Sequence, residues 1–432
     1  MSKQGGNKMK KRWLAAALAL SMVFAGGCGS SGKEDEGSAK SDSGDQVTIT
    51  YMQWQQEFST AAIKLADAYM EEHPNVKVEV ITNSDGYSEN LKAALVAGNV
   101  PEIFVTEGYE NMKSYEEYLT DLSEEEWTGN IKDAALQCVT LDGNIMGMPI
   151  TMAGEGIIYN KKMFKEHGWE VPQTITELEE LCKKIEAEGI TPFNNQFADD
   201  WLLGQFMSGS GYAYIPDNAE YTKELYAGNE KLSENEQMKN SFKVLDLMLK
   251  YGQDDCMSYG WNETCTAFAT GEAAMAFEGD WVWDTVYAID PEIECGMFAL
   301  PATENAEDTK MIVDANGCFH IGKGSAHPEA GLDYLNWIAT SETAKQIMLE
   351  DYKVIPVFEG WEYQADNQLA VSTIEYLDAG KTFMWSWPQW PVGYQYSAGK
   401  TYQNYIDGSM SSDEALQELD DTWTKLVNAK EE

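Results

Sequence analysis

The sequence predicts an α/β protein with two lobes. The first observation is an alternation of strand-like and helix-like segments between residues 47 and 106, which is typical of α/β folds. The second is length: about 390 residues follow the low-complexity segment that ends at residue 45, and one hydrophobic core rarely serves so long a chain. We therefore expect two cores in one chain.

The first elements follow from their residue patterns. Residues 47–52 (VTITYM) are β-branched and aromatic, which predicts a strand. Residues 59–72 place Leu65, Ala66 and Tyr69 at helical spacing, and Pro74 stops that helix. Residues 76–81 (VKVEVI) alternate between apolar and polar, which predicts a second strand.

The next elements extend this alternation. Residues 87–97 have a helical pattern closed by Gly98, and residues 101–106 (PEIFVT) predict a third strand. Strands joined by helices pair in parallel, and such sheets bind ligands beyond the carboxyl ends of their strands. Residues 53–55 and 107–109 occupy those ends.

Later segments add helices of the same kind. Thr176 and Glu179 have the spacing of a capping box before an apolar face that includes Cys182. Residues 328–339 predict another helix, and Ser411 opens the last one.

The start of the chain indicates export and a lipid anchor. A basic stretch precedes an apolar run, Trp13 to Ala25, that is too short to span a bilayer. The run ends in Ala25-Gly26-Gly27-Cys28, which resembles the lipobox of bacterial lipoproteins, although that motif prefers Leu where Ala25 stands. The resemblance implies a signal peptide over residues 1–27 and acylation of Cys28, which would anchor the protein at the outer face of the cell membrane. The alternative is an ordinary secretory signal in which Cys28 is incidental.

Residues 28–45 predict a flexible tether. They are rich in Gly, Ser and acidic residues and contain no aromatic or large aliphatic side chain, so they cannot bury enough surface to fold.

The net charge of the protein limits the classes of ligand that it can bind. Cleavage before Cys28 removes five basic residues, so the net charge of −42 becomes −47, from 25 Lys against 72 acidic residues. This balance excludes nucleic acid and anionic lipid surfaces as partners. The only arginine, Arg12, leaves with the signal peptide. Because Arg is the usual residue for gripping carboxylates and phosphates, its absence favours a neutral, hydroxyl-rich ligand, unless it reflects a general drift towards Lys.

Six cysteines remain after residue 28. Their spacings show no compact disulfide framework, and we expect buried free thiols. No paired Cys or His spacing suggests zinc, and we expect neither a metal nor a cofactor.

Three motifs in order resemble family 1 extracellular solute-binding proteins, the sugar-binding subunits of ABC importers. They are residues 143–164 (GNIMGMPITMAGEGIIYNKKMF), residues 268–281 (FATGEAAMAFEGDW) and residues 324–330 (GSAHPEA). The resemblance covers nearly all of the chain after residue 45. It implies a periplasmic-binding-protein-like fold in which each lobe is a sheet flanked by helices, with ligand in a cleft that closes by hinge motion. It also implies ABC permease partners, and through them an ATPase, and no enzymatic activity.

The family fold implies strands that cross between the lobes. We expect crossings near residues 153–157, 314–318 and 353–357. The first lobe then comprises residues 46–154 and 315–354, and the second comprises residues 155–314 and 355–432.

Sugar-binding pockets combine aromatic rings, which stack on apolar sugar faces, with carboxylates and amides that bind hydroxyl groups. Trp281 matches the family position where a Trp stacks on a sugar, and Glu278 and Asp280 lie beside it. The strand ends and later polar or aromatic segments supply the remaining candidates, which are Gln53, Trp54, Gln55, Glu107, Asn195, Trp201, Asn316, Trp385 and Trp387. The last two belong to a loop, residues 383–394 (FMWSWPQWPVGY), whose two prolines oppose a helix or a central strand. Each tryptophan could instead be core.

The sugar itself is not readable, because the Glu that maltodextrin-binding relatives carry in the first crossing is replaced by Ala153-Gly154, with Glu155 offset. The aromatic content favours an oligosaccharide. Two other interpretations remain open. Acidic clefts also suit polyamines or peptides, and adjacent carboxylates could belong to a secreted glycoside hydrolase, which needs two carboxyl groups about 5–9 Å apart across one bond.

Overall fold

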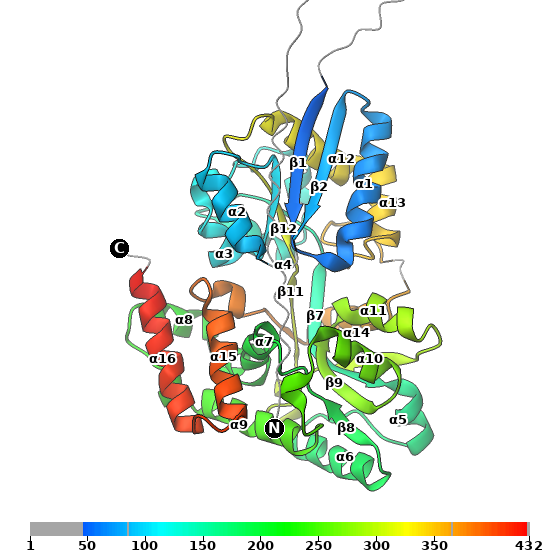
Figure 1. Ribbon diagram of the computed structural model, residues 1–432, viewed down its shortest axis with the longest axis vertical. Coiled ribbons are helices and arrows are strands. Elements are labelled where there is room, and N and C mark those ends of the chain that lie inside the picture. The colour runs from blue at the N-terminus through cyan, green and yellow to red at the C-terminus, as the bar shows by residue number, and fades with distance from the viewer. Residues whose placement is uncertain (1–45, 84–85, 364–365, 430–432) are drawn as a thin grey trace, which may run out of the picture. The chain divides into compact units, whose positions relative to one another are not determined.

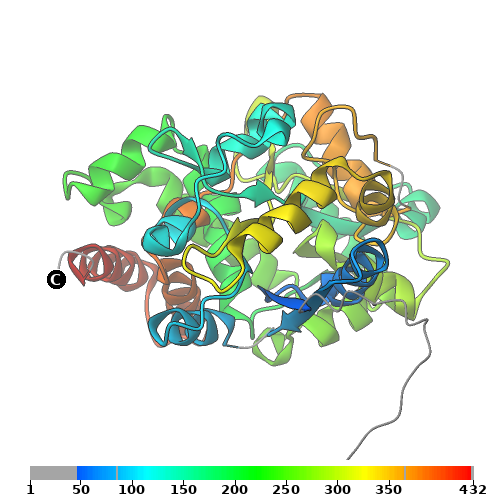
Figure 2. The same ribbon diagram turned by 90° about the horizontal axis from the view of Figure 1, so that it is seen from above.

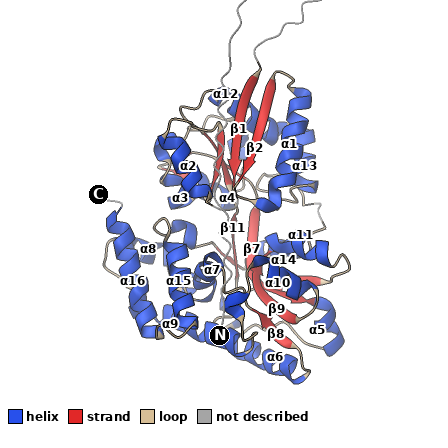
Figure 3. Ribbon diagram, in the orientation of Figure 1, coloured by secondary structure: helices blue, strands red, loops and turns tan. Residues whose placement is uncertain are grey.

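The computed structural model describes residues 46–83, 86–363 and 366–429 (Figure 1). The predicted signal peptide, Cys28 and the tether to residue 45 lie outside the described residues. The described residues belong to one compact unit. Its described part holds two main sheets, each flanked by helices, as Figure 3 shows, so the predicted α/β class and two-lobed fold are confirmed.

The first lobe contains a five-stranded sheet in the order β2-β1-β3-β12-β6. Its strands are β1 (Val47–Gln53), β2 (Val76–Thr82), β3 (Ile103–Thr106), β6 (Met148–Pro149) and β12 (Cys318–Ile321). Strand β1 pairs in parallel with both β2 and β3, as the alternation of elements predicts. Strand β12 returns from far along the chain and pairs antiparallel with β3 and β6.

Helices cover this sheet and bury their apolar faces against it. The main ones are α1 (Ser59–Glu72), α2 (Tyr87–Val96), α3 (Tyr109–Lys113), α4 (Asp133–Leu136), α12 (Pro328–Thr340) and α13 (Glu342–Glu350), and a small hairpin, β4 (Thr140–Leu141) and β5 (Asn144–Ile145), lies between them in sequence. Helix α1 buries Ala62, Leu65 and Tyr69 and packs against β2, while α12 contacts β1 and β12 (Figure 2).

The second lobe is built around the nine-residue strand β7 (Met152–Asn160). The other strands of its sheet are β8 (Thr191–Asn194), β9 (Ala273–Gly279), β10 (Cys295–Phe298), β11 (Met311–Ala315) and β13 (Thr382–Phe383). Strand β7 pairs antiparallel with β9 on one side and with β10 and β11 on the other. This register sets which side chains of β7 and β9 share a face.

Both faces of this sheet are buried. Its helices are α5 (Lys161–His167), α6 (Ile175–Ala187), α7 (Asp200–Ser210), α8 (Asn218–Tyr226), α9 (Glu236–Lys250), α10 (Trp261–Ala269), α11 (Trp283–Ile289), α14 (Gln368–Asp378), α15 (Tyr394–Ile406) and α16 (Ser412–Ala429). Ile157 points to the core formed with α7, whereas its neighbour Ile158 points to the core formed with α10 and α11. That second core continues without interruption into the first lobe.

The chain passes between the two sheets three times. Strand β6 of the first sheet leads into β7 of the second, and β11 of the second leads through Asn316 and Gly317 into β12 of the first. Gly317 has φ +83°, and a Cβ there would meet the side chain of Gln55 at 2.9 Å, so the turn requires glycine. Figure 1 shows β7 and β11 running between the two sheets.

The third passage follows α13. Ile355 forms a bridge with Met152, Phe358 forms one with Ile131, and the Glu359 N–H donates to the Asn130 carbonyl oxygen at 2.8 Å. The Phe358 and Glu359 contacts keep these two residues on the first lobe, whereas Ile355 is bridged to the start of β7. The lobe boundaries stay a prediction, and we propose to place the third one after residue 361 instead of at 354.

The six cysteines after residue 28 are all buried, as expected, and their thiols are free in this structure. Within the described ranges, no helix combines the length and apolar character needed to cross a membrane. The same residues hold no group of three or more His, Cys, Asp or Glu side chains placed to bind a metal ion.

Candidate functional site

Five tryptophans form a continuous row in the second lobe. Ring centroids lie 6.3 Å apart for Trp261 and Trp201, 6.4 Å for Trp201 and Trp281, and 6.1 Å for Trp281 and Trp385. Trp385 and Trp387 are stacked at 4.5 Å. We call these five residues the tryptophan row. Trp261, Trp201 and Trp281 are half-buried, and the stacked pair is almost fully buried.

The position of Trp281 depends on the end of β9, which it follows by two residues. Its ring lies over Gly279, where a Cβ would come within 2.4 Å of the ring atoms. The indole Nε1 donates to Glu278 Oε2 at 3.1 Å. Trp281 packs both against the core shared with the first lobe and against the second lobe's own core. It therefore stands at the boundary between the lobes.

Close packing of α7 on α15 positions another part of the row. A Cβ at Gly399 would lie 1.8 Å from the Asp200 carbonyl oxygen, so only glycine allows this approach. Gln395 Nε2 donates to the Trp201 carbonyl oxygen at 3.1 Å. These contacts bring Trp201 on α7 near Tyr396 on α15, which is about half exposed.

Two buried carboxyl groups lie beside the row. Glu278 and Glu155 are 0% and 1% exposed. Among the described residues, neither oxygen of Glu155 has a hydrogen-bond partner, and Glu278 Oε1 has none. Burial raises the pKa of Glu278 to about 8, and burial together with the nearby Glu278 charge raises that of Glu155. Because buried polar atoms are normally paired, three open oxygens indicate a place for hydroxyl or ammonium donors.

Strand register places these two groups in neighbouring residue pairs, on opposite faces of the sheet, where the Glu278 charge still acts on Glu155. Glu155 of β7 lies directly opposite Gly279 of β9, and Gly156 lies opposite Glu278. The Trp281 ring covers Gly279, so Glu155 lies next to that ring. The β7–β9 pairing thus combines an aromatic surface with carboxyl oxygens.

The first lobe contributes Glu107 and Trp54 at the carboxyl ends of β3 and β1. Glu107 is half-buried, and burial raises its pKa to about 7. Its charge is the largest cause of the raised pKa of Tyr396 on α15 of the second lobe. Trp54 is half-buried against Tyr87, with ring centroids 5.4 Å apart.

A hydrogen bond also joins the lobes here. Tyr109, which begins α3 with φ +46°, donates its hydroxyl to Asp314 of β11 at 3.0 Å. The Asp314 carboxylate also accepts from the N–H groups of Ala315 and Trp385, and burial raises its pKa to about 7. This bond connects a first-lobe loop with the strand beside the tryptophan row.

Three predicted site residues make side-chain hydrogen bonds inside a lobe, although Asn195 Oδ1 is buried without a partner among the described residues. Gln53 accepts from Tyr51 Oη and donates to Thr82 Oγ1, and Asn195 donates to the Met248 carbonyl oxygen. Asp280 accepts from the Gly154 N–H at 2.9 Å and from Thr373 Oγ1 at 2.7 Å, which ties β7 to α14.

Two other predicted site residues, Gln55 and Asn316, meet at the second crossing between the lobes. Gln55 Nε2 donates to the Asn316 carbonyl oxygen at 3.3 Å, while Gln55 Oε1 is buried and unpaired among the described groups. Asn316 lines a cavity of about 40 Å³ at the lobe boundary together with Trp281, Asp280 and Lys353. Apart from Gln53, Asn195 and Asp280, the predicted residues thus fall into three groups: the tryptophan row with Glu278, the first-lobe pair, and the crossing.

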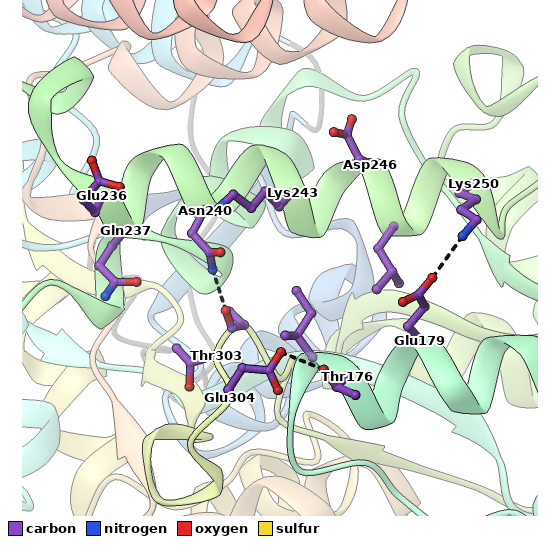
Figure 4. A pocket seen from close by; sticks show the side chains of 13 residues that line it. Thr176, Glu179, Glu236, Gln237, Asn240, Lys243, Asp246, Lys250, Thr303 and Glu304 are labelled. Carbon is purple, nitrogen blue, oxygen red and sulfur yellow. Dashed lines mark hydrogen bonds and ion pairs between the residues drawn. The ribbon is translucent and has the colours of Figure 1, made fainter.

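A larger hollow of about 720 Å³ lies elsewhere, between α6, α9 and residues 302–304 (Figure 4). Two pairs of its polar side chains bond to each other, Lys250 with Glu179 at 3.0 Å and Thr176 with Glu304 at 2.7 Å. It contains no aromatic side chain and none of the predicted residues. Its chemistry suits a hydrated surface better than a sugar pocket.

Sequence reasoning did not select Glu155, Trp261, Tyr109, Asp314 or Tyr396. Glu155 and Glu278 are more than a hundred positions apart, and only the antiparallel register of β7 and β9 places them in neighbouring residue pairs. The available signals were positional: Glu155 and Asp314 lie in predicted crossings, and Tyr109 lies at a predicted strand end.

Comparison with known proteins identifies the family to which this chain belongs. Residues 53–345 match the model of the family described as bacterial extracellular solute-binding protein. A multiple sugar-binding protein of Streptococcus mutans is 26% identical over 308 residues, which cover 68% of this chain and 70% of that protein. The melibiose/raffinose/stachyose-binding protein MelE of Bacillus subtilis is 23% identical over 301 residues, covering 66% and 68%.

Solved structures show the same fold. The solute-binding protein RafE in complex with raffinose has a TM-score of 0.78 at 22% identity, covering 88% of this chain and all of RafE. The binding protein MsmE of Bacillus subtilis, in an open conformation, has a TM-score of 0.77 at 20% identity, covering 90% and 99%.

Proposed function

This chain belongs to the bacterial extracellular solute-binding proteins of ABC importers, and we propose that it is the receptor for a neutral oligosaccharide. The sugar-binding relatives support a carbohydrate ligand, since their names include multiple sugars, raffinose and stachyose. The proposed receptor performs no chemistry. It captures the sugar between its lobes and delivers it to a transmembrane permease.

One observation carries the proposal: the tryptophan row runs beside unpaired carboxyl oxygens. Aromatic faces stack on the apolar C–H surfaces of sugars, and covering one ring face contributes roughly 1–2 kcal/mol by buried area. Glu278 Oε1 and the Glu155 oxygens would accept hydroxyl hydrogen bonds, each contributing roughly 0.5–1.5 kcal/mol. Several rings in sequence suit a ligand of more than one sugar unit.

We assign ligand contact to Trp201, Trp281 and Glu278, with Trp385 and Trp387 as the buried end of the row. Glu155 joins this set because of its open oxygens. From the facing lobe we assign Glu107 and Trp54. We assign structural roles to Gln53, Asn195 and Asp280, whose hydrogen bonds are internal. Gln55 and Asn316 act at the crossing, where closure bends the chain.

Attachment to the membrane is a separate proposal. The lipobox-like sequence ending at Cys28 supports acylation of that residue, and residues 29–45 supply the spacer between lipid and receptor. Mass spectrometry of the mature N-terminus tests this: a diacylated or triacylated Cys28 is expected, and an unmodified N-terminus at another residue would contradict it.

Tryptophan fluorescence titration tests the ligand class. Raffinose, stachyose and other neutral oligosaccharides are added to the purified protein, and the sugar is then recovered and analysed by chromatography. We expect saturable fluorescence change with chemically unchanged sugar. Release of shorter sugars would instead indicate a glycoside hydrolase, and saturation only with spermidine or a peptide would indicate a receptor of that other class.

A further inference from the structure

Two buried cysteines of the first lobe face each other next to the second crossing. Cys138 lies in a short 3₁₀ turn, Gln137–Val139, and Cys318 begins β12. Their sulfur atoms are 3.3 Å apart, although the residues are 180 positions apart in the chain. Both side chains are 0% exposed. The other buried cysteines of the described part, Cys182, Cys256, Cys265 and Cys295, lie in second-lobe elements.

We propose that Cys138 and Cys318 are a cross-linking site, which closes to a single structural disulfide when the exported chain folds in an oxidising environment. A disulfide places its sulfur atoms about 2.05 Å apart, so they need to approach by roughly 1.2 Å. Each residue is held in place by its own local contacts. Cys318 pairs with Thr106 and Pro149 in the sheet, and Cys138 Sγ donates to the Ala135 carbonyl oxygen at 3.1 Å.

The reaction is a thiol–disulfide exchange. Both S–H bonds break, and one S–S bond forms between Cys138 and Cys318. The two electrons pass to the disulfide of an extracytoplasmic thiol oxidase, or of oxidised glutathione in the test tube, which takes up two protons and becomes two thiols. Exported proteins meet such oxidants, whereas cytoplasmic proteins do not.

Burial sets the timing of this step. The attacking species is a thiolate, and in the folded protein the Cys318 sulfur and burial both raise the pKa of Cys138. No oxidant can reach a pair with zero exposure. The exchange therefore precedes the packing of the 3₁₀ turn against β12, and once formed the bond resists external reductant.

The cross-link would brace a loop used by the candidate site. A Cβ at Gly108 would lie 2.6 Å from the Cys138 carbonyl oxygen, so the turn that carries Glu107 and Tyr109 rests directly on Cys138. Tyr109 in turn reaches Asp314. This consequence rests on the proposed function, but the disulfide itself does not.

Oxidative refolding tests the proposal. The purified protein is unfolded, refolded with a glutathione redox buffer, alkylated and mapped by peptide mass spectrometry. We expect a disulfide joining Cys138 and Cys318 and alkylation of the remaining cysteines. The oxidised protein should melt at least about 5 °C above a sample refolded with dithiothreitol, because the bond closes a very long loop.

Two variants make the test specific. Cys318→Ser should abolish the difference in melting temperature between oxidised and reduced samples, while Cys182→Ser, which alters a buried thiol outside the pair, should retain it. Alkylation of both Cys138 and Cys318 in the refolded wild-type protein would overturn the proposal, as would pairing of either residue with another cysteine. Sugar affinity does not enter this readout, so its failure is distinguishable from failure of the proposed function.

Discussion

The Trp281 indole donates a hydrogen bond to Glu278 Oε2 at 3.1 Å, which fixes the most central ring of the tryptophan row to a buried carboxyl group. One contact thus orients both an aromatic surface and an acceptor. The other oxygen of Glu278 remains open in the described structure. The predictions below follow from this arrangement.

Replacing Trp281 by alanine should weaken sugar binding about 5- to 30-fold, because one stacked ring contributes roughly 1–2 kcal/mol. Titration calorimetry on purified variants measures the change. Trp169→Ala is the matched control, since Trp169 is also half-buried in the second lobe but stacks on His167. Equal losses in both variants would show that Trp281 supports the lobe and does not touch the ligand.

Gly279→Ala should reduce affinity without unfolding the protein. The backbone at Gly279 is extended, with φ −106°, so alanine is allowed there, but its Cβ would meet the Trp281 ring at 2.4 Å and displace it. Gly129→Ala is the control, because a Cβ there meets nothing within 4 Å. Affinity and melting temperature are compared, and unchanged affinity in Gly279→Ala would refute the proposed role of the ring's position.

Stability should fall as pH rises from about 4.5 to about 8. Burial raises the pKa of Glu278 from its usual 4.5 to about 8, so in this window the folded protein binds more protons than the unfolded chain. The free energy of unfolding then decreases with increasing pH. Asp280 and Asp314, with pKa values raised to about 7, act in the same direction.

Melting temperatures across this pH range measure the effect. Glu278→Gln should make the decline shallower, whereas Glu272→Gln, at an exposed position, should leave it unchanged. A stability that increases steadily from pH 4.5 to pH 8 would mean that these carboxyl groups ionise freely in the folded protein.

Tyr109→Phe should lower ligand affinity several-fold and open the lobes in the free protein, because it removes the hydroxyl that joins the first lobe to Asp314. Small-angle X-ray scattering of the unliganded protein should give a larger radius of gyration. Tyr115→Phe removes a hydroxyl that contacts Ser88 within the first lobe, and it should change neither quantity. Identical scattering for the wild type and Tyr109→Phe would exclude this bond as an interlobe link.

Local patterns predicted the regular elements well. The expected strand at 47–52 is β1 at Val47–Gln53, and the expected helix at 59–72 is α1 with the same bounds. The capping box expected at Thr176 was wrong by two residues: Thr174 caps α6 and accepts from the Glu177 N–H. The sequence offers two capping boxes with the same spacing, Thr174–Glu177 and Thr176–Glu179. The first one caps the helix, and next to it the Ile175 N–H donates to the Thr303 carbonyl oxygen, which is a tertiary contact.

The candidate site was less predictable, because it depends on how segments far apart in the sequence pair and pack. The sequence marked Trp201, Trp281 and Trp385 as aromatic candidates, but their placement in one row comes from packing of α7 and the 383–394 loop on β9. Gln53 and Asn195 sit at expected element ends, yet their amides turn inward to partners that no local pattern reveals. Their roles as ligand residues stay predictions.

Isothermal titration calorimetry of the purified protein against a panel of neutral oligosaccharides, with spermidine included, tests the central claim most directly. We predict tight binding to one class of oligosaccharide, weakened in Trp281→Ala, with the sugar unchanged afterwards. Heat from spermidine together with no response to any sugar would contradict the carbohydrate assignment and direct attention to Glu155 and Glu278 as a site for cationic ligands.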